Sequence, residues 1–439
     1  MALPAQGASG HTAGISTIGG ARVSIAPASP DLVDRATAAG ITWPSTPSWD
    51  VTTADYDNDG DMDFSMSLHM RNAGEVRRNN GDGTFTRVAV TSNPATTVMP
   101  RPSPQGGLVD RHACAWADFD GNGLQDLYCA AGRYRSNRVK TEAINNELFL
   151  QISPGSFVDR ATASGAGEAC TRGRHVVTFD LNDDGWTDLF LSAQRERSSS
   201  SDPCNAEPDH PYNEQSRVLI NRGENAAGTW LGFRDGPEWN VSQNNVGNRL
   251  ALAWDYNRDG RPDLLGQAFA GKRPYLMRNT GTGFAEMSRS RQVTLPFFNA
   301  ATVADLTGDG IPDLVYSDGS GFAYRAGTAG GVSTSTVRIG TISGAKAWSV
   351  AVGDVNGDGR LDVYGQVGSS SGSGNPDDVI YVRTAAGGWQ AHVVPSAGGD
   401  ANDVEAVTVG GRAQFVVLNG GNKESNNPGP IQVIAWAGP

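Results

Sequence analysis

The sequence predicts an all-β protein, a seven-bladed β-propeller of four-stranded blades, and two observations carry that prediction. The chain has 439 residues with 56 glycines, and its apolar runs are short and end near Gly, Asn or Asp, which is typical of short strands joined by turns. A nine-residue acidic pattern, D-x-[D/N/T]-x-[D/N]-G-x-x-D, recurs six times along the chain. A unit that recurs along the chain in this way is typical of propellers and solenoids.

Each copy of the acidic pattern lies between two strand-like runs. The copies begin at Asp55, Asp118, Asp180, Asp255, Asp305 and Asp354. VTTA precedes the first copy and FSMSL follows it, so the loop is expected to join two antiparallel strands. Two more strand-like runs follow in most units, which gives the four strands of a propeller blade.

The two ends of the chain together predict the seventh blade. TVGGRAQFVVLNGG resembles AVGDVNGDGRLDVYGQVG with the acidic loop deleted, and Gly411 stands where Asp354 stands. LVDRATAAG near the N-terminus nearly duplicates FVDRATASG, which occupies a fourth-strand position. We therefore expect residues 31–439 to form one propeller domain whose ring is closed by an N-terminal strand, because closure removes exposed sheet edges. Residues 1–30 are expected to be a partly flexible extension.

The acidic loops have the ligand pattern of a calcium site. Oxygen ligands alternate at positions 1, 3 and 5, Gly at position 6 allows a sharp turn, position 7 offers its carbonyl, and an aspartate closes the shell at position 9. Position 12 holds residues such as Met66 and Leu191 in place of the Glu of an EF-hand, which excludes that motif. The thiolate and imidazole ligands of zinc sites are absent from the loops. Loop five carries Thr307 at position 3 and is expected to bind most weakly.

The predicted structural calcium sites number up to six, one for each loop. Their ligands are Asp55, Asp57, Asp59, Asp61 and Asp63; Asp118, Asp120, Asn122, Leu124 and Asp126; Asp180, Asn182, Asp184, Trp186 and Asp188; Asp255, Asn257, Asp259, Arg261 and Asp263; Asp305, Thr307, Asp309, Ile311 and Asp313; and Asp354, Asn356, Asp358, Arg360 and Asp362.

Charge and composition exclude several classes of partner. The formal net charge of −12 argues against a binder of the nucleic-acid backbone, which needs a basic face. No run of apolar residues is long enough for a membrane helix. The four cysteines could pair as Cys114–Cys129 and Cys170–Cys204, which favours a secreted or periplasmic location after removal of a signal peptide, against four buried thiols. We expect a monomer.

The acidic loops between apolar strands, from DYDNDGDMD to DVNGDGRLD, resemble the calcium-binding FG-GAP or VCBS repeats of the integrin alpha-subunit propeller. Units such as NNGDGTFTRVAV look like the bacterial and CRTAC-like branch of that family. The resemblance covers roughly residues 31–439 and implies seven blades with calcium between the first and second strands. The family includes adhesins, lectins, polysaccharide lyases and enzymes that build natural products, and fold does not choose among them.

The face opposite the acidic loops is where a ligand is expected. Basic and aromatic residues precede or begin the first strands there: Trp49, Arg111, His112, Arg174, His175, Arg249 and Trp348. For any single one of them, the alternative is a side chain that only bonds a neighbouring carbonyl. Arg side chains suit carboxylate or sulfate, and Trp side chains stack on sugar rings, so the expected ligand is a glycan or another anionic or polyhydroxylated molecule. A protein partner is a further possibility.

A catalytic role for the same face is the alternative. His112 and His175 could act as acid and base, while Arg174 and Arg249 could neutralise a uronate. That arrangement would suit a polysaccharide lyase or a natural-product cyclising or alkylating enzyme. Since no nucleophile elbow, catalytic zinc motif or phosphate loop occurs, the sequence favours a binding module over an enzyme.

Overall fold

The computed structural model describes most of the chain outside the N-terminus and a set of loops. The described residues are 29–41, 48–68, 74–88, 111–132, 145–167, 173–193, 216–239, 248–268, 273–288, 293–369, 376–395, 397–399, 401–420 and 429–438. The predicted flexible extension 1–30 therefore lies almost wholly outside this part of the chain.

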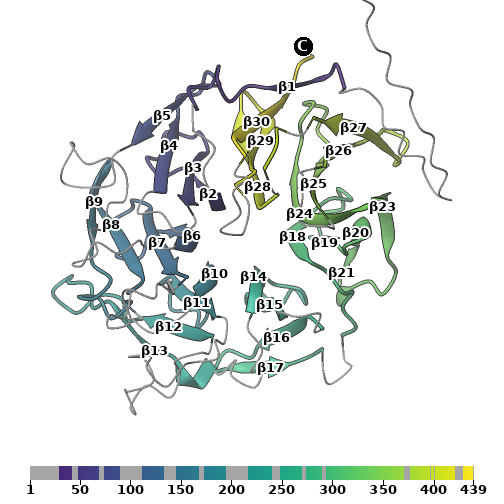
Figure 1. The fold of residues 1–439 in the computed structure, drawn as a ribbon. Coiled ribbons are helices and arrows are strands. Elements are labelled where there is room, and N and C mark those ends of the chain that lie inside the picture. Colours follow the sequence, from purple (N-terminus) through teal and green to yellow (C-terminus); the bar gives the residue numbers. More distant parts are fainter. Residues whose placement is uncertain are drawn as a thin grey trace, which may run out of the picture.

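Seven four-stranded antiparallel sheets form a ring around a central axis (Figure 1). This confirms the predicted fold. Blade 1 contains β2 (Ser48–Ala54), β3 (Asp63–Leu68), β4 (Gly74–Asn79) and β5 (Phe85–Val88). Blade 2 contains β6 (Arg111–Ala117), β7 (Asp126–Ala131), β8 (Glu147–Ser153) and β9 (Ser156–Asp159). Blade 3 contains β10 (Gly173–Phe179), β11 (Asp188–Ala193), β12 (Arg217–Asn221) and β13 (Phe233–Asp235).

The remaining blades follow in chain order. Blade 4 contains β14 (Asn248–Trp254), β15 (Asp263–Ala268), β16 (Tyr275–Asn279) and β17 (Phe284–Glu286). Blade 5 contains β18 (Ala300–Ala304), β19 (Asp313–Ser317), β20 (Gly321–Arg325) and β23 (Val337–Thr341). Blade 6 contains β24 (Ala345–Gly353), β25 (Asp362–Ser369), β26 (Asp378–Arg383) and β27 (Trp389–Val394). The short strands β21 (Gly327–Thr328) and β22 (Gly331–Val332) pair with each other, and η2 (Pro237–Trp239) is a 3-10 turn.

Blade 7 combines the two ends of the described chain. It contains β28 (Asp403–Val409), β29 (Arg412–Leu418), β30 (Ile431–Trp436) and, as its outermost strand, β1 (Leu32–Asp34). Leu32 pairs with Trp436 and Asp34 with Ile434, so the N-terminal segment lies beside the C-terminal strand (Figure 1). The first hairpin of this blade turns at Gly410 and Gly411, both with positive φ, where the other blades carry an acidic loop.

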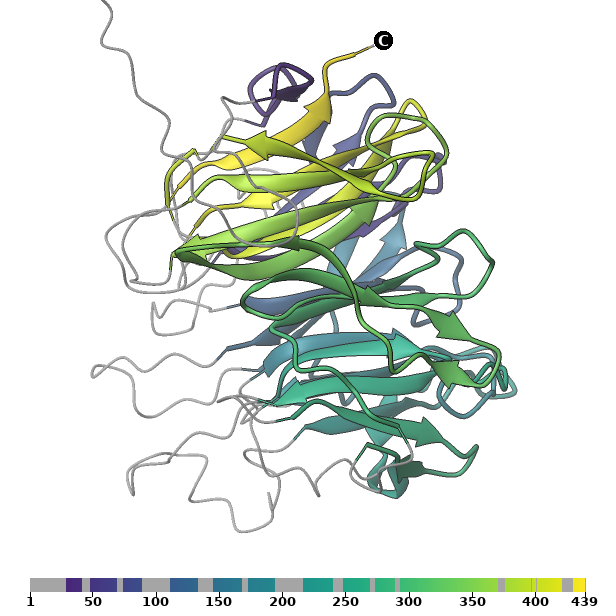
Figure 2. The same cartoon turned by 90° about the vertical axis from the view of Figure 1, so that its right-hand side faces the viewer.

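The hydrophobic core is divided among the contacts between neighbouring blades. Each of seven buried clusters draws its side chains from two adjacent blades; one joins Phe64 and Val51 of blade 1 to Val416 and Val433 of blade 7. Figure 2 shows the blades from the side, with strands that run from one face of the ring to the other. The first strand of every blade therefore lies next to the axis, and its two ends open on opposite faces.

Candidate functional site

The six acidic loops share one backbone conformation. Each joins the first and second strands of its blade. The glycine at position 6 has positive φ in every loop, for example 94° at Gly60 and 80° at Gly359, and position 4 is also left-handed, as at Asn58 and Arg258. The first aspartate accepts the N–H groups that this turn presents: Asp55 bonds to the backbone nitrogens of Asp59 and Gly60, both at 3.0 Å. The repeated sequence pattern therefore folds into a repeated cradle.

The side chains of these loops fit a hard cation. In loop 1 the carboxylates of Asp55, Asp57 and Asp63 bring ligand oxygens within 4.8 Å of one another, and the same positions of loop 2 do so as well. Asp57 Oδ1 is buried and has no hydrogen-bond partner in the described structure. A bound cation would satisfy this oxygen. In the other four loops position 3 offers an amide or hydroxyl oxygen, from Asn182, Asn257, Thr307 and Asn356. Oxygen ligands of this kind suit calcium.

The ninth-position aspartates tie each loop to the rest of its blade. Asp63 is fully buried, and its two carboxylate oxygens accept the N–H groups of Tyr56 at 3.0 Å and Asn79 at 2.7 Å. Asp126 does the same with Phe119 and Gln151. Burial raises the pKa of both carboxyls to about 7. A bound cation would offset that cost of burial.

The first strands of five blades have a β-bulge at the end that lies away from the acidic loop. In five blades the pairing of the first and second strands slips by a β-bulge close to the beginning of the first strand. The residues left out of the pairing are Trp49, His112, Arg174, Arg249 and the pair Trp348 and Ser349. Bulges re-aim side chains and are frequent beside functional sites. Five of the seven residues predicted to bind a ligand thus occupy equivalent bulged positions, although the side chain of Arg249 is outside the described structure.

Three of the bulged residues contact one another across blades 1, 2 and 3. The rings of Trp49 and His112 are stacked, with centroids 4.5 Å apart and planes inclined by 16°. The guanidinium of Arg174 lies 5.9 Å from the centre of the Trp49 ring and contacts His112 Nδ1 closely. The sequence prediction placed these residues on one face, and the structure brings them into a single cluster.

Arg111 has a different role from the one expected. It is 1% exposed, and its guanidinium forms two hydrogen bonds with the carboxylate of Glu147, one of them at 2.9 Å. A buried arginine paired in this way offers little to a ligand, because breaking the pair would leave Glu147 buried and uncompensated. We therefore assign Arg111 to the support of blade 2 and leave it out of the ligand site.

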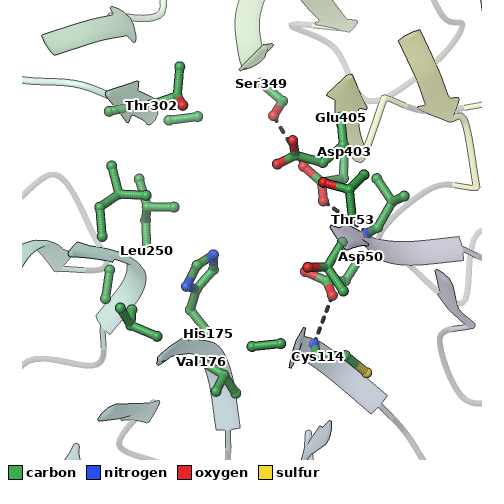
Figure 3. Close-up of a pocket in the computed structure, with 18 of the residues that line it drawn as sticks. Asp50, Thr53, Cys114, His175, Val176, Leu250, Thr302, Ser349, Asp403 and Glu405 are labelled. Carbon is green, nitrogen blue, oxygen red and sulfur yellow. Dashed lines mark hydrogen bonds between the residues drawn. The ribbon is translucent and has the colours of Figure 1, made fainter. Parts of the chain in front are cut away.

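A cavity of about 320 Å³ runs along the axis and is lined by the first strands of all seven blades. Asp50, Asp403 and Glu405 form one wall of it, and His175 projects from the opposite side (Figure 3). Asp50 accepts the N–H of Cys114 at 2.8 Å, and Asp403 accepts the N–H of Val51 at 3.1 Å. The lining contains no Lys or Arg among the described residues.

Electrostatics in the cavity favour uncharged side chains. Burial, with the nearby Asp403 carboxylate as the next cause, raises the pKa of Glu405 to about 8 and that of Asp50 well above its usual range. Burial lowers the pKa of His175 to about 4, so the ring is neutral at pH 7, and its Nδ1 has no hydrogen-bond partner in the described structure. The wall therefore presents two carboxyl groups, those of Asp50 and Glu405, whose ionisation is suppressed, facing a neutral imidazole.

Sequence reasoning missed the three acids of this wall. Asp50 follows the predicted Trp49 directly, and Asp403 and Glu405 alternate in the first strand of the blade that has no acidic loop. That alternation was the available signal. The large number of aspartates in the loops concealed it, and the closed ring predicted from the sequence did not say which residues of blades 1 and 7 face each other.

The disulfide Cys114–Cys129 forms across the paired strands β6 and β7, as predicted. The other predicted pair, Cys170–Cys204, lies outside the described residues. In the part of the chain that the structure covers, no helix has the length and apolar character needed to cross a membrane.

The fold is a β-propeller, and in six of its blades the loop between the first and second strands carries oxygen ligands that suit a cation. Residues 55–129, 118–191, 255–316 and 305–365 match the FG-GAP-like repeat, which amounts to more than half of the chain. The protein therefore belongs to the FG-GAP-like repeat family. The matched segments contain all six acidic loops and leave out blade 7.

Solved structures of similar shape have little sequence in common with this chain. An Agrocybe aegerita lectin described as recognising non-reducing terminal N-acetylglucosamine is 17% identical, with a TM-score of 0.48 over 87% of this chain and 93% of that chain. BBS1N, solved in complex with ARL6DN, is 10% identical, with a TM-score of 0.46 over 89% and 93%. Streptogramin B lyase is 11% identical, with a TM-score of 0.48 over 92% and 97%. No curated protein matches the chain significantly.

Proposed function

We propose that this protein is a secreted, calcium-stabilised propeller that binds a polyhydroxylated ligand, such as a glycan, where the axial cavity opens on the face opposite the acidic loops. The observation that carries the proposal is the set of bulged first-strand residues around that opening. Trp49, His112, Arg174 and Trp348 all depart from regular pairing at the same strand position. A regular sheet gains nothing from five such bulges, whereas a binding surface does.

The chemistry around the cavity suits hydroxyl groups better than negative charge. Asp50, Asp403 and Ser349 supply hydrogen-bond acceptors or donors on one wall. His112 and Arg174 are buried against each other and would shape the neighbouring surface without reaching a ligand themselves. Trp348 is half-buried and offers a ring surface on which a sugar could stack. An anionic ligand would have to approach the three carboxyl groups of this wall, and the described lining contains no Lys or Arg to offset them, so a neutral glycan fits better than a uronate or sulfate.

Calcium would be held in the six acidic loops, on the other face. There it would stabilise the first hairpin of each of six blades and take no direct part in ligand binding. Secretion is supported by the disulfide Cys114–Cys129, since such bonds persist in oxidising compartments. Calorimetric titration of metal-stripped protein tests the calcium assignment; absence of any calcium binding would refute it.

Binding of the ligand is tested on an array of neutral, amino and acidic glycans, followed by calorimetry of the best ligand. We expect the neutral class to bind, and Trp348→Ala to weaken binding at least tenfold. Trp389→Ala is the matched control, because Trp389 lies on the outermost strand of blade 6 and should leave affinity unchanged. If no glycan binds, or if only acidic glycans bind, the proposal is wrong.

An enzymatic role is the second candidate, and His175 is the observation that favours it. A neutral imidazole with a buried, unpartnered Nδ1 opposite carboxyl groups could accept a proton from a bound substrate. Incubation of the bound glycan with the protein, followed by mass analysis, separates the two roles. A product that disappears in His175→Gln would indicate catalysis, and an unchanged glycan would indicate binding alone.

A further inference from the structure

Neighbouring acidic loops are joined by a repeated side-chain hydrogen bond. In blade 2, Gln151 at the third strand gives its backbone N–H to Asp126, the ninth residue of loop 2, at 2.7 Å. Its side-chain Nε2 reaches into blade 1 and donates to the carbonyl of Tyr56 at 3.0 Å. Tyr56 is the second residue of loop 1, and its own N–H donates to Asp63 at 3.0 Å. An unbroken path thus runs from the closing aspartate of loop 2 to that of loop 1.

The same path recurs between the next loops. Asn221 of blade 3 donates its N–H to Asp188 and its side chain to the carbonyl of Phe119 in loop 2, both at 2.8 Å. Asn279 of blade 4 donates its side chain to the carbonyl of Leu181 in loop 3 at 2.7 Å. All of these amide side chains are buried. Loops 1, 2, 3 and 4 are therefore linked in sequence.

Loops 5 and 6 form a second linked pair through an arginine. Arg383 of blade 6 donates its N–H to Asp362 at 2.8 Å and its guanidinium to the carbonyls of Leu306 and Thr307 in loop 5, the latter at 3.3 Å. Thr307 in turn donates its N–H to Asp313 at 2.8 Å. The residue type differs from that of blades 2 to 4, but the connection is equivalent.

The path is interrupted between loops 4 and 5. Gly327 occupies the linking position of blade 5, where its N–H donates to Asp313 at 2.8 Å. It has no side chain to reach the carbonyl of Tyr256 in loop 4. A Cβ at this position would lie 2.4 Å from the carbonyl oxygen of Pro312, so a larger residue does not fit without rearrangement.

We propose that calcium binding is coupled between adjacent loops in two groups, loops 1 to 4 and loops 5 to 6, with no coupling across Gly327. The proposal rests on the calcium binding proposed above. An ion fixes the loop that holds it, and with it the backbone at position 2 and the closing aspartate. The amide side chain transmits this order to part of the neighbouring loop before that loop binds its own ion. The conformational free-energy cost of the next binding step is therefore lower.

The test follows calcium occupancy loop by loop. Metal-stripped full chain is titrated with calcium, and hydrogen exchange of peptides that cover each loop gives six midpoints. Asp118→Ala removes a ligand of loop 2 but is not itself on the path. We expect it to raise the midpoints of loops 1 and 3 at least threefold and to leave loops 5 and 6 unchanged. Asp120→Asn serves as a milder variant if Asp118→Ala folds poorly.

A second substitution breaks the link, together with the bonds of the same side chain to the Gln125 carbonyl and the Gly155 N–H. Gln151→Met keeps the backbone N–H and the side-chain length but removes the donor to Tyr56. When Asp118→Ala is added to this variant, the calcium midpoint of loop 1 should no longer change, whereas the midpoint of loop 3 should still rise. Gln432→Met, at a buried glutamine of blade 7, is the control and should retain both shifts.

Three outcomes would overturn the coupling. The first is that Asp118→Ala changes the calcium midpoints of all loops equally, and the second is that it changes the midpoint of no neighbouring loop. The third is that Asp305→Ala changes the midpoint of loop 4, since it should affect only its neighbour, loop 6. Failure of the wild-type chain to bind calcium at all would refute the calcium proposal itself, and the coupling with it. Independent calcium binding at every loop would refute the coupling alone.

Discussion

The indole of Trp49 lies parallel to the imidazole of His112, with ring centroids 4.5 Å apart, and the two residues belong to neighbouring blades. Arg174 of the third blade completes the cluster. Trp49→Ala should lower the free energy of unfolding by about 1–2 kcal/mol, since an aromatic pair and a cation–π contact are lost together. It should also abolish glycan binding. Guanidinium unfolding in saturating calcium measures the first effect, and calorimetry the second.

His112→Phe is the matched variant for this cluster. It preserves a stacked ring against Trp49 and removes the contact with Arg174. Stability should fall less than in Trp49→Ala. Equal losses in the two variants would mean that the polar contact contributes as much as the stacking and the cation–π contact together.

Glu405 should make stability depend on pH. Its pKa is about 8 in the folded protein against 4.5 as usual, so between these values the folded chain holds a proton that the unfolded chain has lost. Its contribution is therefore complete below about pH 4.5 and is lost as the pH rises through about 8. Relative to wild type, Glu405→Gln should gain stability with rising pH, by up to about 1.4 kcal/mol per pH unit. Unfolding curves from pH 5 to 9 measure the difference.

Glu238→Gln provides the control of opposite sign. The hydrogen bond from Arg234 lowers the pKa of Glu238, so its carboxylate stabilises the fold above its usual pKa. The Gln variant should therefore lose a little stability at neutral pH. A Glu405→Gln curve parallel to wild type at every pH would contradict the assignment of Glu405.

Loop five should gain calcium affinity from one carboxylate. Thr307 stands at position 3, where loops 1 and 2 carry Asp57 and Asp120, and its Oγ1 is buried. Thr307→Asp should tighten calcium binding at this loop about tenfold, because calcium affinity rises with the number of charged ligands. Calorimetry of metal-stripped protein checks it. Asn182→Asp in loop 3 replaces a working ligand and should have a smaller effect; unchanged or weaker binding in Thr307→Asp would contradict the ligand set.

Deletion of residues 31–40 should lower the melting temperature and promote aggregation. This segment contains β1, which pairs with β30, and buries Ala36 and Ala39 against blades 7 and 1. Its loss leaves the edge of β30 unpaired. Asp34→Ala is the milder variant, since Asp34 accepts the N–H of Val433 at 3.1 Å. Calorimetry and light scattering measure both effects, and an unchanged melting temperature would show that β1 is dispensable.

The blades, the acidic loops and the Cys114–Cys129 pair could all be predicted from the sequence. Each of these depends on residues close together in the chain: alternation within a strand, a nine-residue turn, or two cysteines opposite each other in one hairpin. Strand pairing within a hairpin follows from such local patterns, and six repetitions made the pattern unambiguous. The absence of an acidic loop from blade 7 could be predicted for the same reason, because Gly411 stands where Asp354 stands in its own unit.

The set of side chains around the axis depends on how the blades pack against one another. Val51 and Asp403 are 352 residues apart and yet share a hydrogen bond, because blade 7 lies beside blade 1 in the ring. A one-residue slip in pairing re-aims Trp49, His112 and Arg174, whereas Arg111 turns inward to Glu147. These outcomes depend on contacts between blades, which local sequence patterns do not encode. The strands could therefore be predicted from the chain alone, but the composition of the cavity and the links between loops could not.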